Sequence, residues 1–105
     1  ENRRLAAPAS LDGGITSALQ EGILTQGTPA ADKALAVIAN LETVLAIEVM
    51  AAAQAYDMRP GLSDKASGTN GLYERIRGIV PIYRDDRPLN GLLAMTREFI
   101  STNAT

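Results

Sequence analysis

The strongest constraint in this sequence is a long stretch, residues 29–59, that has no glycine and no proline after its first residue. Thr28 is a suitable N-cap, and Pro29 then stands at the first helical position, where proline is favoured. Pro60 and Gly61 follow directly and are typical of the end of a helix. At about 1.5 Å per residue the predicted helix is roughly 45 Å long, far longer than an average helix of about 11–12 residues.

The second half of this helix, VLAIEVMAAAQAY at residues 44–56, has only two polar residues, Glu48 and Gln54. A helix that is apolar on nearly every face is buried on nearly every face. We expect Glu48 to be a buried acid that pairs with an arginine or bonds to a neighbouring helix, because a bare buried carboxylate is strongly disfavoured. The run is shorter than the roughly 18 residues of a membrane span, and Glu48 lies in its middle, so no membrane is expected.

The remaining sequence contains two shorter helical patterns and a loop-like start. Residues 71–80 and 88–100 both place apolar side chains at spacings of three and four, and Asp86 is available to cap the second pattern. No stretch alternates as a strand does. The sequence therefore predicts an all-α fold in one partial domain, made of a loop segment over 1–28, a long core helix over 29–59, and a connector with two shorter helices over 60–105.

Two short helices cannot cover a helix of this length. We infer that the long helix packs against other chains or against further polypeptide of its own chain. The sequence begins with Glu1 rather than methionine and carries no signal-peptide pattern, which fits a piece of a longer protein.

Composition excludes several classes of function. A net charge of −2 and a pI near 5.0 argue against a nucleic-acid surface. The absence of cysteine removes disulfides and thiolate metal sites and suits the cytoplasm, and the absence of histidine removes the commonest general base and metal ligand. No metal is expected, and any chemistry depends on carboxylates, tyrosine, arginine and lysine.

Glu21 is the most suggestive carboxylate. It lies in the glycine-flanked segment ALQEGILTQG beside Gln20, just before the long helix. Most loop acids are simply solvated, yet a rigid helix next to a loop is a good place to hold a polar pair.

Other polar residues have plainer interpretations. Asp85, Asp86 and Arg87 are expected to form a cap and a local ion pair. Arg75 and Arg77, two residues apart, cannot share a helix face and are expected to pair at the surface or between chains. Tyr56, Tyr73 and Tyr83 are not interleaved with basic residues as a base-stacking surface would require.

Two stretches together resemble the C-terminal part of the histidine and phenylalanine ammonia-lyase family. They are ENRRLAAPASLDGGITSALQEG and ETVLAIEVMAAAQAYDMR, and the later YRDDRPL is also similar. The matching residues are Glu1-Asn2, Leu5-Ala6, Pro8-Ala9-Ser10, Asp12, Thr16-Ser17-Ala18, Gln20-Glu21, Leu45-Ala46-Ile47-Glu48, Ala51-Ala52-Ala53-Gln54-Ala55, Asp57 and Arg59. The resemblance covers essentially the whole chain but only about the last fifth of a family member.

The resemblance implies a mainly helical homotetramer that deaminates an aromatic or imidazole amino acid to an alkenoate and ammonia. It implies a 4-methylideneimidazol-5-one group made from an Ala-Ser-Gly triplet far upstream, so that Ala66-Ser67-Gly68 in this chain is a chance match. Glu21 matches the family's active-site glutamate, which lies near the cofactor and the substrate amine, and Gln20 matches its polar neighbour. The catalytic tyrosine base and the cofactor triplet are not in this chain.

The sequence also departs from the family pattern. The family commonly has Asn-Gln-Glu-Asp-His, whereas this chain has Gly22 and Ile23 after Glu21. The change removes polar partners and puts histidine specificity in doubt. We therefore interpret the chain as a fragment or split subunit of such a lyase, inactive alone. An aminomutase of the same family and a non-catalytic helical oligomerisation module stay open as alternatives.

Overall fold

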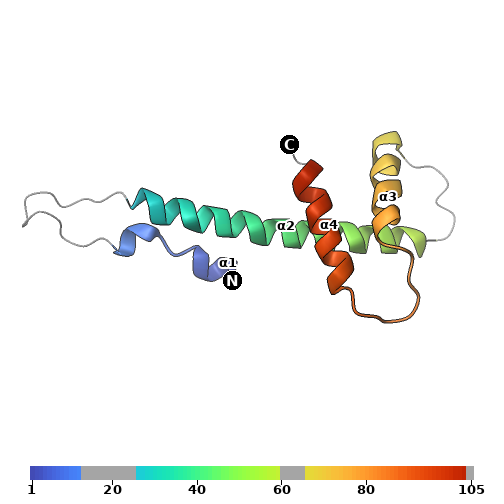
Figure 1. The fold of residues 1–105 in the computed structure, drawn as a ribbon, viewed down its shortest axis with the longest axis horizontal. Coiled ribbons are helices and arrows are strands. Elements are labelled where there is room, and N and C mark those ends of the chain that lie inside the picture. The colour runs from blue at the N-terminus through green and yellow to red at the C-terminus, as the bar shows by residue number, and fades with distance from the viewer. Residues whose placement is uncertain (13–25, 60–65, 104–105) are drawn as a thin grey trace, which may run out of the picture. The chain divides into compact units, whose positions relative to one another are not determined.

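A computed structural model of the chain describes residues 1–12, 26–59 and 66–103, and all the regular elements in these ranges are helical. In chain order they are α1 (Asn2–Leu5), the 3₁₀ turn η1 (Ala9–Asp12), α2 (Gly27–Asp57), α3 (Ser67–Ile79) and α4 (Asn90–Asn103) (Figure 1). The predicted all-α fold, with one long helix followed by two shorter ones, is confirmed. The chain forms two compact units, residues 1–41 and 42–105, and α2 contributes to both.

Helix α2 begins and ends two residues earlier than predicted. Thr28 lies inside the helix and is not its cap, because the chain enters through Gln26, whose φ of 46° is left-handed backbone. At the other end the backbone NH of Arg59 bonds to the Tyr56 carbonyl at 3.3 Å, a tight turn that closes the helix before Pro60. Shifts of one or two residues are usual at helix ends, since caps compete with turns.

The first unit corrects the prediction that residues 1–28 are loop throughout. Residues 2–5 and 9–12 form the short helical turns α1 and η1. Ala9 is buried, and two hydrogen bonds join this segment to α2, from the Lys33 Nζ to the Ala7 carbonyl at 2.8 Å and from the Asn40 Nδ2 to the Asn2 Oδ1 at 2.7 Å. Sequence patterns missed these turns because four residues are too few to show a helical period.

The second unit has a small apolar core where α3 and α4 meet the C-terminal half of α2. Met50 and Ala53 of α2 pack with Ile76 and Val80, and these four are buried. The partly buried residues around them are Val49, Tyr73, Ile79, Leu89, Leu92, Leu93 and Phe99. Both short helices therefore face α2 through the apolar positions that their spacing predicted.

Both predicted short helices are present, but their predicted first residues differ from the observed ones. Helix α3 starts at Ser67 rather than near residue 71. Helix α4 starts at Asn90, and its first bonds include Leu93 N to the Leu89 carbonyl at 2.8 Å. Asp86 lies four residues before α4 and therefore cannot cap it.

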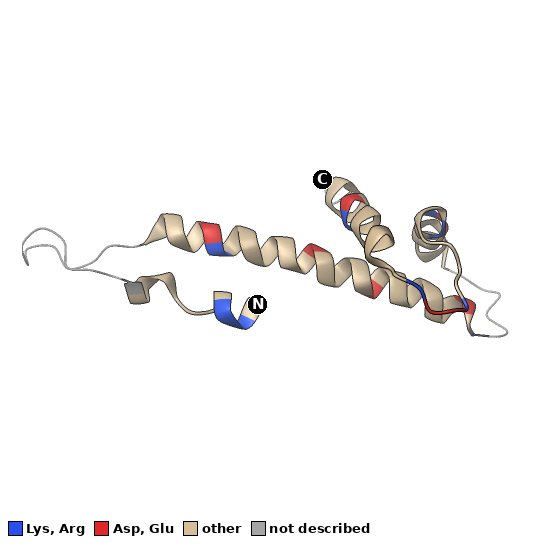
Figure 2. Cartoon of the chain, turned by 60° about the horizontal axis from the view of Figure 1, so that its bottom comes forward, with Lys and Arg blue, Asp and Glu red and all other residues tan. Residues whose placement is uncertain are grey.

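Much of α2 stays uncovered within this chain. Leu35, Ile38, Val44 and Ile47 are each more than half exposed, and Figure 2 shows only a few charged bands along the helix. Glu48 is exposed as well and has no hydrogen-bond partner among the described residues, so its predicted burial and pairing are not found within this chain. The described residues outside α2 therefore do not enclose the helix on every side.

By length and composition alone, α2 is also able to cross a membrane, with an 18-residue window of mean hydropathy 1.8. The apolar run at residues 44–56 is too short to span a membrane, but the whole of α2 is not, because apolar residues continue before residue 44. The core helix of a soluble protein meets the same criterion, so this finding by itself is weak support for a membrane.

Ile76 tests this core. Its side chain is 1% exposed, so Ile76→Ala should leave a cavity and lower the free energy of unfolding by about 2–4 kcal/mol. The measurement is urea unfolding of the chain followed by far-UV circular dichroism. Ile82→Ala, at a site 56% exposed, is the matched control and should cost less than about 0.5 kcal/mol. Equal losses for the two variants would contradict the described core.

Candidate functional site

The two residues that the sequence singles out, Gln20 and Glu21, lie outside the described residues. What the structure describes are the segments on either side of them. Asp12 ends η1, and Gln26 immediately precedes α2. Both segments belong to the first unit, where residues 2–12 are attached to the N-terminal half of α2.

The second unit contains a cluster of buried and half-buried polar side chains that sequence analysis did not predict. Gln54 and Asp57 come from the end of α2, and Tyr73 and Arg77 come from α3. Arg77 forms a salt bridge with Asp57, and the Tyr73 hydroxyl donates a hydrogen bond to the same carboxylate. The side chains of Arg77 and Asp57 are only 11% and 15% exposed, so this ion pair is largely removed from water.

Backbone carbonyls complete the cluster. Arg77 Nη1 donates to the Val80 carbonyl at 2.9 Å, and its Nη2 lies 3.3 Å from Gln54 Oε1. Gln54 Nε2 in turn donates to the Tyr83 carbonyl at 2.6 Å. The cluster thus connects α2, α3 and the segment after α3 through one guanidinium and one amide.

A signal for the cluster was present in the sequence. Gln54 and Asp57 are three residues apart and Tyr73 and Arg77 are four apart, so each pair shares one helix face. Polar residues on the inner faces of two apolar helices predict a mutual contact. The expectation that Arg77 pairs at the surface or between chains is wrong, because its partners lie within this chain and the ion pair with Asp57 is largely removed from water.

The electrostatics of the cluster oppose acid–base chemistry at neutral pH. The hydrogen bond to Asp57 and the burial of the phenol raise the pKa of Tyr73 above its ordinary value of 10.0, although nearby Arg77 partly opposes this. A tyrosine with a raised pKa stays protonated and is a poor general base. Asp57 is engaged by Arg77 and Tyr73 together, so the cluster is built to join two helices.

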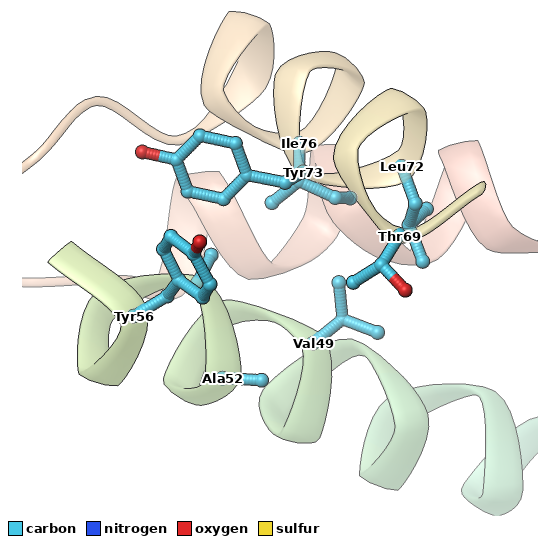
Figure 3. Close-up of a pocket in the computed structure, with 8 residues that line it drawn as sticks. Val49, Ala52, Tyr56, Thr69, Leu72, Tyr73 and Ile76 are labelled. Carbon is cyan, nitrogen blue, oxygen red and sulfur yellow. The ribbon is translucent and has the colours of Figure 1, made fainter. Parts of the chain in front are cut away.

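An apolar pocket lies beside this cluster, between α2 and α3 (Figure 3). The rings of Tyr56 and Tyr73 stand at one end, with centroids 5.3 Å apart and planes tilted by 50°. Its volume is about 150 Å³, and its lining residues are Val49, Ala52, Ala53, Tyr56, Thr69, Leu72, Tyr73 and Ile76. None of these carries a charge that would hold the carboxylate or ammonium of an amino acid, so the pocket suits a small apolar group.

The Ala-Ser-Gly triplet does not fit a cofactor-forming site. Ser67 and Gly68 lie exposed in the first turn of α3, and the Ala66 carbonyl accepts the hydrogen bond of Asn70 N at 2.9 Å. Cyclisation would have to break this helical turn, and nothing in the described part of the chain encloses it. This supports the prediction that the triplet is a chance match.

The remaining predicted groups are dispersed. Asp85 and Asp86 are exposed and form no ion pair within the described ranges, whereas Arg87 lies over the Tyr83 ring at 5.4 Å, which corrects the predicted local ion pair. Arg75 contacts Asn103 and lies over the Phe99 ring at 4.6 Å. Among residues 1–12, 26–59 and 66–103, no group of three or more acidic side chains could hold a metal ion.

Comparison with known proteins identifies the kind of protein to which this helical segment belongs. A sequence model for aromatic amino acid lyases matches residues 1–78. The chain therefore belongs to the aromatic amino acid lyase family.

The relatives and a solved structure agree with this assignment. The histidine ammonia-lyase of Natranaerobius thermophilus is 46% identical over 85% of this chain, and that of Bacillus subtilis is 45% identical over 83%. The crystal structure of histidine ammonia-lyase from Trypanosoma cruzi superposes on 97% of the chain with a TM-score of 0.85 at 28% identity. The chain spans only 17% of the two relatives and 20% of the solved chain, so it corresponds to a part of such an enzyme.

The buried ion pair gives a prediction with a clear sign. Arg77→Met leaves the Asp57 carboxylate buried without its cation and should lower the free energy of unfolding by about 3 kcal/mol. The double variant Asp57→Leu with Arg77→Met removes both charges and should lose less. Arg97→Met, which breaks the more exposed 3.5 Å pair with Glu42, should cost under about 1 kcal/mol. Urea unfolding measures all three, and a double variant worse than Arg77→Met would contradict the account.

Tyr73 gives a prediction about alkaline pH. Because its pKa is raised in the folded state, its contribution is fully present below its ordinary pKa of 10.0 and is lost as pH rises through the folded value. Unfolding free energies measured between pH 8 and pH 11 should therefore fall more steeply for the unaltered chain than for Tyr73→Phe. Tyr83→Phe removes one phenol elsewhere in this unit and serves as the control. Parallel curves for Tyr73→Phe and the unaltered chain would refute the proposed linkage.

Proposed function

We propose that this chain supplies part of the active site of an amino-acid ammonia-lyase, a carbon–nitrogen lyase that converts an amino acid to an alkenoate and ammonia. The observation that carries the proposal is the family match over residues 1–78, a range that includes Gln20 and Glu21. The substrate class is an amino acid with an aromatic or imidazole side chain. Histidine is the first to test, because the relatives are named histidine ammonia-lyases.

In this proposal Glu21 is the catalytic residue of the chain, and Gln20 binds substrate beside it. A carboxylate next to the substrate amine stabilises the ammonium form and exchanges a proton with it. A neighbouring amide orients the substrate through hydrogen bonds without changing charge. Gly22 and Ile23 after this pair add no further titratable group, so the proton transfer in this segment depends on Glu21.

The electrophile is proposed to come from outside this chain. A 4-methylideneimidazol-5-one group, when present, supplies the electrophilic carbon that these lyases need. The described triplet at 66–68 is exposed, its last two residues begin α3, and it does not fit that role. We accordingly propose that the 105-residue chain alone is inactive and works with the remainder of a lyase polypeptide.

The partners follow from the same reasoning. The exposed apolar side chains of α2, which include Leu35, Ile38 and Ile47, are proposed to be covered by other lyase polypeptide in a tetramer rather than by lipid. Nucleic acid is not a proposed partner, given the acidic balance of the chain. A cytoplasmic location is part of the proposal because the chain has no cysteine.

One observation favours a second candidate, a non-catalytic helical module that retains the scaffold. Gly22 and Ile23 stand where the family resemblance implies an acid and a histidine. If the site has lost its function, Glu21 carries no chemistry and its substitution is silent. An aminomutase of the same family would instead retain Glu21 and yield a β-amino acid, which product analysis distinguishes from an alkenoate.

Glu21→Gln is the direct test. In material whose gel and intact mass show an accompanying lyase polypeptide, we expect this variant to lower kcat/KM by about 10²–10⁴-fold. Alkenoate formation from histidine, phenylalanine and tyrosine is followed by ultraviolet absorbance. Asp85→Asn, which neutralises an exposed carboxylate between α3 and α4, is the control and should keep full activity. Unchanged turnover in Glu21→Gln would favour the non-catalytic module.

A further inference from the structure

The dipeptide Asn-Gly occurs twice in this chain, and the two copies stand in different structural positions. Asn70 and Gly71 lie inside α3, whereas Asn90 and Gly91 are the first two residues of α4. Asparagine before glycine is especially prone to lose ammonia, because glycine has no side chain to keep its backbone nitrogen away from the asparagine amide. The local structure then determines which copy reacts.

Asn70 is held in place by hydrogen bonds. Its backbone NH donates to the Ala66 carbonyl at 2.9 Å, and its side-chain Nδ2 donates to Glu74 Oε1 at 2.7 Å. Gly71 comes after the first four NH groups of α3, which are the ones that a helix leaves without a partner, so its NH belongs to the helical ladder. The two groups that would have to react with each other are therefore both engaged.

Asn90 has none of these restraints. The bond from Leu93 N to the Leu89 carbonyl makes Asn90 the first and Gly91 the second residue of α4, so their NH groups have no partner within the helix. Among the described residues, neither the exposed Asn90 side chain nor the Gly91 NH has a hydrogen-bond partner. The space beside Gly91 is also open, since a Cβ added there would meet no atom outside its own turn within 4 Å.

We propose that Asn90 is a site of spontaneous deamidation, with Gly91 as the internal nucleophile and water as the co-reactant. The Gly91 nitrogen gives its proton to a base and attacks Cγ of Asn90. The new N–Cγ bond closes a succinimide ring, the bond from Cγ to Nδ2 breaks, and Nδ2 takes up a proton and leaves as ammonia. The reaction needs no lyase activity, so this site is independent of the proposed function.

Water then opens the ring in one of two ways. Attack at Cγ breaks the new bond and leaves aspartate, whereas attack at the backbone carbonyl carbon leaves isoaspartate, whose main chain runs through Cγ. Both products carry one more negative charge than asparagine. Ring closure requires the first turn of α4 to open, and helix ends open most readily. In α3 the same motion must first break the hydrogen bonds of Asn70.

The two products have different effects on α4. Aspartate places a negative charge at the positive end of the helix dipole, so the helix is retained. Isoaspartate adds a methylene to the main chain between residues 90 and 91, and the bond from Leu93 N to the Leu89 carbonyl spans this point. Because Leu92 and Leu93 pack against the core of the second unit, the isoaspartyl form loosens that packing.

Peptide mass spectrometry compares the two sites in one sample. Trypsin releases residues 66–75 and 85–97 as separate peptides, and each contains a single asparagine. Purified protein whose far-UV circular dichroism shows the helical fold is kept at mildly alkaline pH and sampled over days. We expect the Asn90 peptide to gain the mass that accompanies exchange of NH2 for OH at least about tenfold faster than the Asn70 peptide.

Two controls show whether the structure and the proposed nucleophile are responsible. In protein incubated in urea the two dipeptides are equally free and should react at similar rates. Gly91→Ala adds a methyl group beside the attacking nitrogen and should slow the reaction at Asn90 about tenfold, with Asn70 unchanged. Equal rates at the two sites in the folded protein, or a Gly91→Ala variant that reacts as fast as the unaltered chain, would overturn the inference.

Discussion

The apolar surface of α2 is the physical constraint on which the rest of this chain depends. In the first unit the short segment carrying α1 and η1 lies along one stripe of the helix. In the second unit α3 and α4 bury Met50 and Ala53. Several large side chains on the other faces stay exposed. Covering one such leucine or isoleucine is worth about 1.5–3 kcal/mol, so a strong driving force for association is left on the surface.

Apolar burial alone would not define how α3 meets α2, because alanine-rich faces permit helices to slide. The largely covered ion pair of Asp57 and Arg77 favours one position of α3 along α2, since each charge is costly without the other. Gln54 and Tyr73 extend the network, and Arg77 and Gln54 also bind the carbonyls of Val80 and Tyr83. We interpret this cluster as the feature that selects one arrangement among several of similar apolar area.

The first unit also combines apolar packing with specific polar contacts. In the first unit the side chains of Lys33 and Asn40 of α2 bond to the Ala7 carbonyl and to Asn2. The residues assigned to chemistry, Gln20 and Glu21, come between Asp12 and Gln26 in the sequence. The chain covers less than a quarter of the relatives it matches, which is consistent with a site completed by other polypeptide.

The sequence by itself determined the helical class, the long central helix and the family, because these depend on local periodicity, on the lack of glycine and proline, and on residues matched in order. It also singled out Glu21, whose role stays a prediction. Only the tertiary structure decided that Glu48 is exposed within this chain, that Arg77 forms a largely covered ion pair with Asp57, and that Lys33 bonds to Ala7. Those outcomes depend on which faces of different helices meet, and contacts between residues far apart in sequence leave no periodic trace along the chain.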